Sequence, residues 1–148
     1  MTNPACPLCQ APGGALVFQA EKFRVIHADE VGFPAFYRVV WTEHVAEFSE
    51  LSSTDQRVCM QAVAVVEQVL REVLQPTKIN LAALGNMVPH LHWHVIARFD
   101  WDSHFPAPVW AQALREAAPE KLSALQQQRS ALERVMAQRL GAALRPTA

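Results

Sequence analysis

Three histidines alternate with apolar residues in the segment His90-Leu91-His92-Trp93-His94. In a β-strand successive side chains point to opposite faces, so this period places all three imidazoles on one face, about 6.6 to 7 Å apart. Such a row can bind a metal ion. It can also surround a phosphate, with one neutral imidazole attacking phosphorus while the others donate hydrogen bonds. The alternative is a solvent-facing strand that happens to carry histidine, which the strict alternation with apolar partners disfavours.

The flanking sequence predicts the elements that must position this row. Short runs rich in β-branched and aromatic residues predict strands at 15–19, 23–27, 36–41, 78–81 and 91–99. A capping box at Ser53-Thr54-Asp55-Gln56, followed by apolar residues spaced by threes and fours, predicts a long helix that stops at Pro76. Helices are also predicted at 109–117 and 121–140. The pattern indicates a sheet covered by one long helix, with C-terminal helices.

Length, composition and charge limit the classes of function. A chain of 148 residues with 51% apolar and 18% charged residues is predicted to form one compact domain. Its formal charge of −1 provides no basic field for nucleic acid or an anionic membrane. No apolar run approaches the roughly 18 to 20 residues that span a bilayer. The three cysteines and the lack of a secretory pattern predict a cytoplasmic protein.

The segment His-Leu-His-Trp-His-Val-Ile resembles the His-φ-His-φ-His-φ-φ signature of the histidine triad (HIT) family of nucleotide hydrolases and transferases. The similarity extends over about half the chain, from Phe23 to Phe99, and includes a Gly-containing turn just before the triad. It implies an α+β fold with a mostly antiparallel sheet and one long helix, and a homodimer that forms one continuous sheet. Residues 1–106 would form the HIT-like domain, and residues 107–148 a helical extension packed on the same domain.

The resemblance implies that the protein is an enzyme that transfers a nucleoside monophosphate onto histidine and then to water. In that scheme His92 is the nucleophile, His90 supports the arrangement and His94 faces the phosphate. The ring of His92, with an ordinary pKa of about 6.5, is largely neutral at pH 7 and suited to attack. The implied substrate is a dinucleoside polyphosphate or a similar phosphoanhydride, cleaved at the α-phosphate. Backbone amides of the turn at 85–88 would approach the developing charge.

By the same similarity, five further residues are candidates for nucleotide binding. Asn80 would form a hydrogen bond with a ribose hydroxyl or a phosphate. Alternatively, its side-chain amide satisfies backbone hydrogen-bonding groups at a strand end. Asp29 would bind ribose, in an alignment that can shift by one position, and Ile26 would pack on the base unless it is plain core. Arg98, together with Lys78 and Arg38, would supply positive charge to phosphates, or each is a surface charge. Asn86 occupies the turn before the triad.

One departure from the family pattern favours a second function. Where many members carry Gln followed by Ser or Thr, this chain has Asn86-Met87, and a methionine cannot donate a hydrogen bond to the scissile linkage. Phosphoramidate cleavage is therefore in doubt. The alternative is a nucleotide-binding or zinc-stabilised interaction module with little turnover.

A structural zinc site is also predicted. Cys6-Pro7-Leu8-Cys9 supplies two ligands, which alone do not close a tetrahedral site. Some triad proteins complete the site with residues that correspond to His44 and His90. Alternatively, His44 lines the phosphate pocket and the cysteines are a free thiol pair, or the triad itself binds a catalytic metal. No organic cofactor is expected.

Overall fold

A computed structural model of the chain describes residues 2–144. Its elements are α1 (Pro7–Gln10), β1 (Ala15–Gln19), β2 (Phe23–His27), β3 (Phe36–Trp41), η1 (Phe48–Glu50), α2 (Ser53–Leu74), β4 (Lys78–Ala82), β5 (His92–Arg98) and α3 (Pro119–Ala143). The five strands form one antiparallel sheet in the order β1-β2-β3-β5-β4. The α+β fold class is therefore confirmed.

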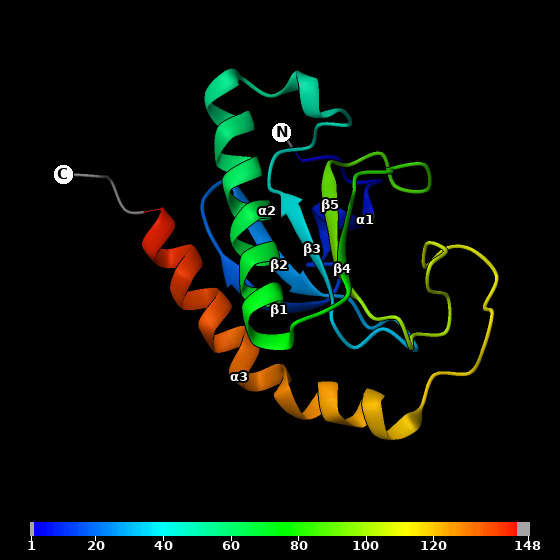
Figure 1. Cartoon of the computed structure of the whole chain (residues 1–148). Coiled ribbons are helices and arrows are strands. Elements are labelled where there is room, and N and C mark those ends of the chain that lie inside the picture. The colour runs from blue at the N-terminus through cyan, green and yellow to red at the C-terminus, as the bar shows by residue number, and fades with distance from the viewer. Residues whose placement is uncertain (1, 145–148) are drawn as a thin grey trace.

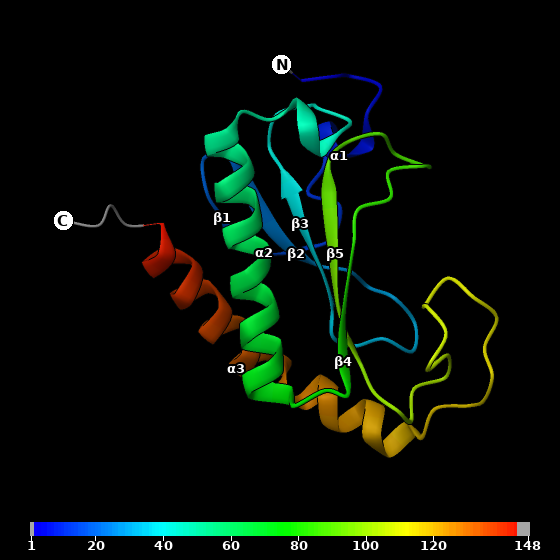
Figure 2. The same cartoon turned by 45° about the horizontal axis from the view of Figure 1, so that its top comes forward.

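One face of the sheet is covered by the two long helices. In Figures 1 and 2, α2 passes in front of β1 and β2 and α3 runs below the sheet and rises at the left, while the β4–β5 loop and the loop after β5 lie at the right. Alternate residues of the strands, such as Tyr37, Val39 and Val95, are fully buried in the core beneath α2. Helix α3 joins that core through Leu132, Met136 and Leu140, the residues of α3 that are buried.

Helix α2 begins one residue earlier than its capping box predicts. Ser52 is the N-cap, because its side chain accepts a hydrogen bond from the backbone N–H of Asp55. The helix ends at Leu74, and its C-cap Gln75 takes the left-handed conformation with φ at 49°, immediately before Pro76. The proline has no N–H and cannot continue the helix, so the predicted end is close to the observed one.

On the opposite face of the sheet, the described residues form two small buried clusters. The N-terminal knuckle packs Cys6 and Leu8 against Ile26 and Val40. A second small cluster joins Phe33, Phe36 and Ile96, with Val109 of the loop after β5 packed against it. The histidines of β5 lie on this face between the two clusters.

The prediction of a helix at 109–117 is wrong. Residues 99–118 form an irregular loop, and the single C-terminal helix α3 starts at Pro119 rather than at residue 121. The backbone N–H groups of Leu114 and Arg115 both donate to the carbonyl of Ser103. The Arg115 side chain donates to the carbonyls of Asp102 and Phe105 at 2.8 and 2.7 Å. These hydrogen bonds satisfy polar backbone groups of the loop in place of the hydrogen bonds that a helix would form.

None of the helices in the described part of the chain combines the length and the apolar character that crossing a bilayer requires.

Candidate active site and metal cluster

The pairing register places His92 and His94 on the same face of the sheet as a cation of the neighbouring strand, Arg38. On β5, His92 pairs with Val40 and His94 pairs with Arg38. Paired residues of an antiparallel ladder project from the same face, so Arg38 and His94 meet directly. The Nε atom of Arg38 donates to Nδ1 of His94 at 3.3 Å, and the rings of His92 and His94 lie 5.0 Å apart.

The His92 ring is oriented by the backbone of the first triad residue. Its Nδ1 lies 2.6 Å from the carbonyl oxygen of His90, which can only accept, so Nδ1 carries the proton. Burial lowers the pKa of His92, and this bond opposes the shift. The ring is thus neutral at pH 7, and the lone pair on Nε2 is free to attack.

His94 is also held neutral. Burial, followed by the neighbouring His92 and the Arg38 guanidinium, lowers its pKa to about 4. Because Arg38 donates to Nδ1, the proton of the neutral ring resides on Nε2. His94 can therefore donate a hydrogen bond to a phosphate oxygen or a leaving group without carrying a charge.

His90 stands apart from the other two histidines. It precedes β5 rather than belonging to it, is fully buried, and donates from Nε2 to the carbonyl of Trp41 at 2.7 Å. Its Nδ1 points into a cluster with Cys6, Cys9 and His44, whose ligand atoms all lie within 4.8 Å of one another. The alternating pattern predicts one continuous row of three histidines on the strand. The structure does not form this row, because the ring of His90 belongs to the cluster instead.

The four ligand atoms could hold a metal ion. His90 Nδ1 lies 3.4 Å from Cys6 Sγ and 3.3 Å from His44 Nδ1, and Cys9 Sγ lies 3.4 Å from His44 Nδ1. Tetrahedral zinc, with bonds of about 2.3 Å to sulfur and about 2.0 to 2.1 Å to nitrogen, needs ligand separations of about 3.3 to 3.8 Å. The bond from His90 to the Trp41 carbonyl fixes the ring, as outer-shell partners of metal-bound histidines commonly do.

The pocket beside the triad has a volume of about 480 Å³. His92, His94 and Arg38 form its floor on the sheet. Its walls come from the knuckle, the β4–β5 loop and the loop after β5, and consist of Pro7, Leu8, Leu84, Gly85, Asn86, Met87, Val88 and Trp110. Gly85 takes a φ of 70°, a conformation open to glycine, and turns the β4–β5 loop over the floor.

Two of the predicted nucleotide ligands are instead engaged with each other. Arg98 is 1% exposed and forms a buried ion pair with Asp102, with Nε to Oδ2 at 2.8 Å. It also donates to Asn80 Oδ1 at 2.8 Å and to the carbonyl of Ala107 at 2.7 Å. Neither Arg98 nor Asn80 lines the triad pocket, so the structure gives both a role in holding the loop after β5.

The other predicted ligands divide between the pocket and the body of the protein. Asn86 lines the pocket, as expected for the turn before the triad. Ile26 is completely buried under Cys6 and Leu8, and so belongs to the core, as its alternative interpretation has it. Asp29 is exposed and is not among the residues that line the pocket.

Two lining residues are not among those to which the resemblance assigns a role. Arg38 is predicted only as one of three charges that could meet phosphates, and its alternation with Tyr37 and Val39 on a predicted strand places it on the opposite face from the core. Trp110 had no such signal, since it lies in a segment predicted to be helical. Its ring is 51% exposed and its centroid lies 5.2 Å from that of His94.

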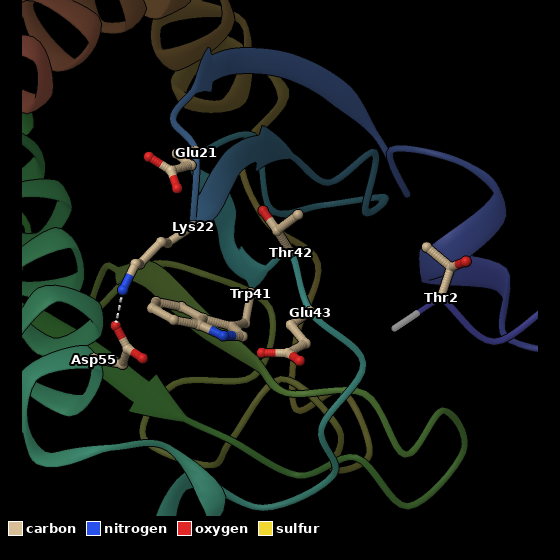
Figure 3. A pocket seen from close by; sticks show the side chains of 7 residues that line it. All are labelled: Thr2, Glu21, Lys22, Trp41, Thr42, Glu43 and Asp55. Carbon is tan, nitrogen blue, oxygen red and sulfur yellow. Dashed lines mark hydrogen bonds and ion pairs between the residues drawn. The ribbon is translucent and has the colours of Figure 1, made fainter.

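A separate cavity of about 390 Å³ lies near the ends of β2 and β3 and shares no lining residue with the triad pocket. Figure 3 shows its mixed charges, with Lys22 and Asp55 paired across one side. Glu21, Glu43 and the buried Trp41 also line it. Because Lys22 already has a carboxylate partner, the described residues that line this cavity offer no free cation to a phosphate.

Comparison with known proteins identifies the family of this fold and site. The HIT domain model matches residues 13–101. A histidine triad protein from Bradyrhizobium japonicum is 30% identical, with 84% of this chain and 92% of that chain covered and a TM-score of 0.67. Similar proteins from Sinorhizobium meliloti and Marinobacter aquaeolei are 28% and 25% identical, cover 84% and 87% of this chain and 89% and 92% of their own, and have TM-scores of 0.67 and 0.71. No curated protein matches the chain.

Proposed function

This chain belongs to the HIT domain family of histidine triad proteins, and from that premise we propose that it is a nucleotide hydrolase or nucleotidyl transferase that acts at the α-phosphate. The observation that carries the proposal is the 2.6 Å contact between His92 Nδ1 and the His90 carbonyl, which leaves Nε2 as a free nucleophile beside the pocket.

The reaction proceeds in two displacements at phosphorus. His92 Nε2 forms a bond to the α-phosphorus, the bond to the leaving group breaks, and the leaving group departs with the bonding electron pair. Water then attacks the same phosphorus and releases a proton to the solvent, the N–P bond breaks with its electron pair returning to Nε2, and the nucleoside monophosphate and neutral His92 are released. Arg38 and His94 donate toward the phosphate oxygens, where negative charge develops in each displacement.

We further propose zinc as the metal of the Cys6, Cys9, His44 and His90 cluster. Two thiolates and two imidazoles form a closed four-ligand set that suits structural zinc. When bound there, zinc supplies structure and no open coordination position. His90 then belongs to the metal site through its ring and to the active site through its carbonyl.

A homodimer is part of the same proposal. Strands β1 and β4 are the edges of the sheet, and β4 is short, with Leu81 40% exposed. Pairing of an edge strand with its copy would extend the sheet across two chains and satisfy the free edge. Light scattering on the purified protein should give twice the chain mass of 16.5 kDa, and a monomeric mass would contradict this part.

Met87 favours the second candidate function, a nucleotide-binding module with little turnover. Its side chain lines the pocket, is 94% exposed and cannot donate a hydrogen bond to a leaving group. In that case nucleotides bind but no covalent intermediate accumulates.

Trapping of the intermediate separates the two functions. The wild-type protein is mixed with a dinucleoside polyphosphate labelled at the α-phosphate and quenched without acid, which preserves an N–P bond. We expect label on the wild type, none on His92→Ala, and wild-type labelling on a control, His104→Ala, whose ring lies outside the pocket. Equal label on wild type and His92→Ala contradicts the proposed nucleophile, and nucleotide binding without label supports the module.

A further inference from the structure

We propose that Trp110 is a specificity-determining residue whose indole stacks on the nucleobase of the nucleotide that is transferred to His92. The inference rests on the proposed function and adds a base-binding subsite to it. The subsite lies in the loop after β5, outside the residues to which the resemblance assigns nucleotide binding.

The position of Trp110 fits an aromatic platform. Its ring meets that of His94 at 69°, with 5.2 Å between centroids, and half of its surface remains open to the pocket and solvent. Two other large apolar side chains of the pocket wall, Leu84 and Met87, are 51% and 94% exposed. Exposed apolar side chains that gather around one cavity commonly mark a ligand-binding surface.

The alternative binding site for the base is not accessible. The resemblance places the base against Ile26, but that residue has no exposed surface, because Cys6 and Leu8 of the knuckle lie over it. A methyl group on neighbouring Gly14 would come within 2.4 Å of the His27 carbonyl, so the backbone there is closely packed. A base that accompanies a phosphate at His92 must therefore lie elsewhere, and Trp110 lines both this pocket and the adjoining cavity beside β4.

The charges of the pocket also separate a phosphate end from an apolar end. Arg38 is the single arginine or lysine among the lining residues, and it also pairs with Glu30 at 3.1 Å. One cation that is already shared fits one phosphate group better than an extended polyphosphate. The remaining wall, with Trp110, Leu84 and Met87, complements a flat apolar ring, and the volume of about 480 Å³ is typical of a site for one small molecule.

The loop that carries Trp110 is fixed to the sheet before any ligand arrives. Buried Arg98 donates to the carbonyl of Ala107, three residues before the tryptophan. Val109, its immediate neighbour, packs against the cluster of Phe36 and Ile96. A platform that is held in place loses little conformational freedom on binding.

Stacking on an aromatic face depends little on which base is bound, because every base has a π-face. Leu84 and Met87 have no strong donor or acceptor with which to read the edge of a base. We therefore expect Trp110 to favour nucleotides over base-free sugar phosphates, with little preference among the four bases.

Equilibrium binding measures this subsite without any need for turnover. The probes are AMP, GMP, CMP, UMP and ribose 5-phosphate, titrated by calorimetry into wild type, Trp110→Ala, Trp110→Phe and the control Leu114→Ala. Leu114 lies in the same loop, is 60% exposed and does not line the pocket. We expect Trp110→Ala to weaken all four nucleotides by about tenfold or more, and Trp110→Phe by about threefold or less. Ribose 5-phosphate should bind equally to all four proteins.

Tryptophan fluorescence provides a second measurement. AMP should quench the emission of the wild type, and the quenching should disappear in Trp110→Phe, although the other three tryptophans remain. The proposal is overturned if Trp110→Ala binds AMP as wild type does, or if it loses ribose 5-phosphate affinity as much as AMP affinity.

Failure of this proposal is distinct from failure of the proposed function. Label on His92 together with unchanged nucleotide affinity in Trp110→Ala overturns the stacking alone. Conversely, Trp110-dependent AMP binding without any label on His92 overturns the enzymatic function and leaves the stacking in place.

Discussion

The backbone carbonyl of His90 lies 2.6 Å from Nδ1 of His92, while the ring of the same His90 lies in the metal cluster. One residue therefore joins the candidate metal ligands to the proposed nucleophile. The His90 ring is fixed on both sides, by the cluster at Nδ1 and by the Trp41 carbonyl at Nε2. The carbonyl that orients His92 thereby takes its position from groups outside the pocket.

Metal content should depend on the cluster and not on the nucleophile. We expect purified wild-type protein to contain about one zinc ion per chain, and Cys6→Ser to lose it, because three remaining ligands do not close a tetrahedral site. His92→Ala and Cys59→Ser should retain zinc, since neither residue belongs to the cluster. Elemental analysis of the four proteins measures this. Zinc lost from His92→Ala but kept in Cys6→Ser would show instead that the triad holds the metal.

Breaking the buried ion pair should destabilise the whole domain. Arg98→Met leaves Asp102, which is 2% exposed, as an unpaired carboxylate in the interior. We expect the free energy of unfolding to fall by about 3 to 5 kcal/mol. Urea denaturation measures the change, with Arg57→Met on the exposed side of α2 as a control that should change it by no more than about 0.5 kcal/mol. A loss below about 1 kcal/mol for Arg98→Met would argue that the pair contributes little.

Removal of Arg38 should weaken phosphate binding. Its guanidinium donates to His94 and is the lining cation of the pocket. Because hydrogen bonds to charged groups contribute about 1.5 to 3 kcal/mol, we expect Arg38→Met to lower kcat/KM by about 10- to 100-fold. Arg38→Lys should recover only part of this, since an ammonium group lacks the fork of the guanidinium. Steady-state kinetics at constant ionic strength tests this, and unchanged kcat/KM in Arg38→Met would contradict the assignment.

The lowered pKa of His94 should reduce the free energy of unfolding of the protein in mild acid. Its pKa is lowered from 6.5 to about 4, so between these values the unfolded chain binds a proton that the folded protein does not. The contribution of His94 to the free energy of unfolding is therefore fully present above pH 6.5. It falls by on the order of 3 kcal/mol as the pH falls toward 4. The free energy of unfolding of wild type minus that of His94→Asn, measured across pH 4 to 7, should show this slope. A flat difference would show that His94 titrates normally.

Much of the architecture could be predicted from local pattern. The runs at 15–19, 23–27 and 36–41 are strands with the expected bounds, and α2 has the expected apolar spacing. These elements are determined by side-chain periodicity and by breakers such as Pro76, which act over short distances. The loop after β5 was not predictable in this way, because the apolar residues at 109–117 mimic a helix. Tertiary hydrogen bonds from Arg98 and Arg115 determine its conformation instead.

The candidate site was predictable where the chemistry lies in one motif and less so where it depends on long-range packing. The metal cluster brings together the four residues that the resemblance implies. The burial of Ile26 depends on the knuckle, and the burial of Arg98 depends on its ion pair with Asp102 and on the conformation of the loop after β5. A single sequence does not show which charge on a strand will be paired, so Arg98 could not be distinguished from a ligand for phosphate.

The walls of the pocket have an implication for the order of folding. Cys6 reaches His90 across 84 residues, and the cover at the other end is a loop that follows the last strand. Closing the 84-residue span from Cys6 to His90 costs more chain entropy than closing the 56-residue span from Arg38 to His94 on the floor, so the knuckle should dock after β3 and β5 have paired. The sheet should therefore assemble as an exposed surface first, and the triad pocket should close only when the knuckle and the 99–118 loop have docked. In native-state hydrogen exchange, the knuckle and the 99–118 loop should open at lower free energy than β3 and β5.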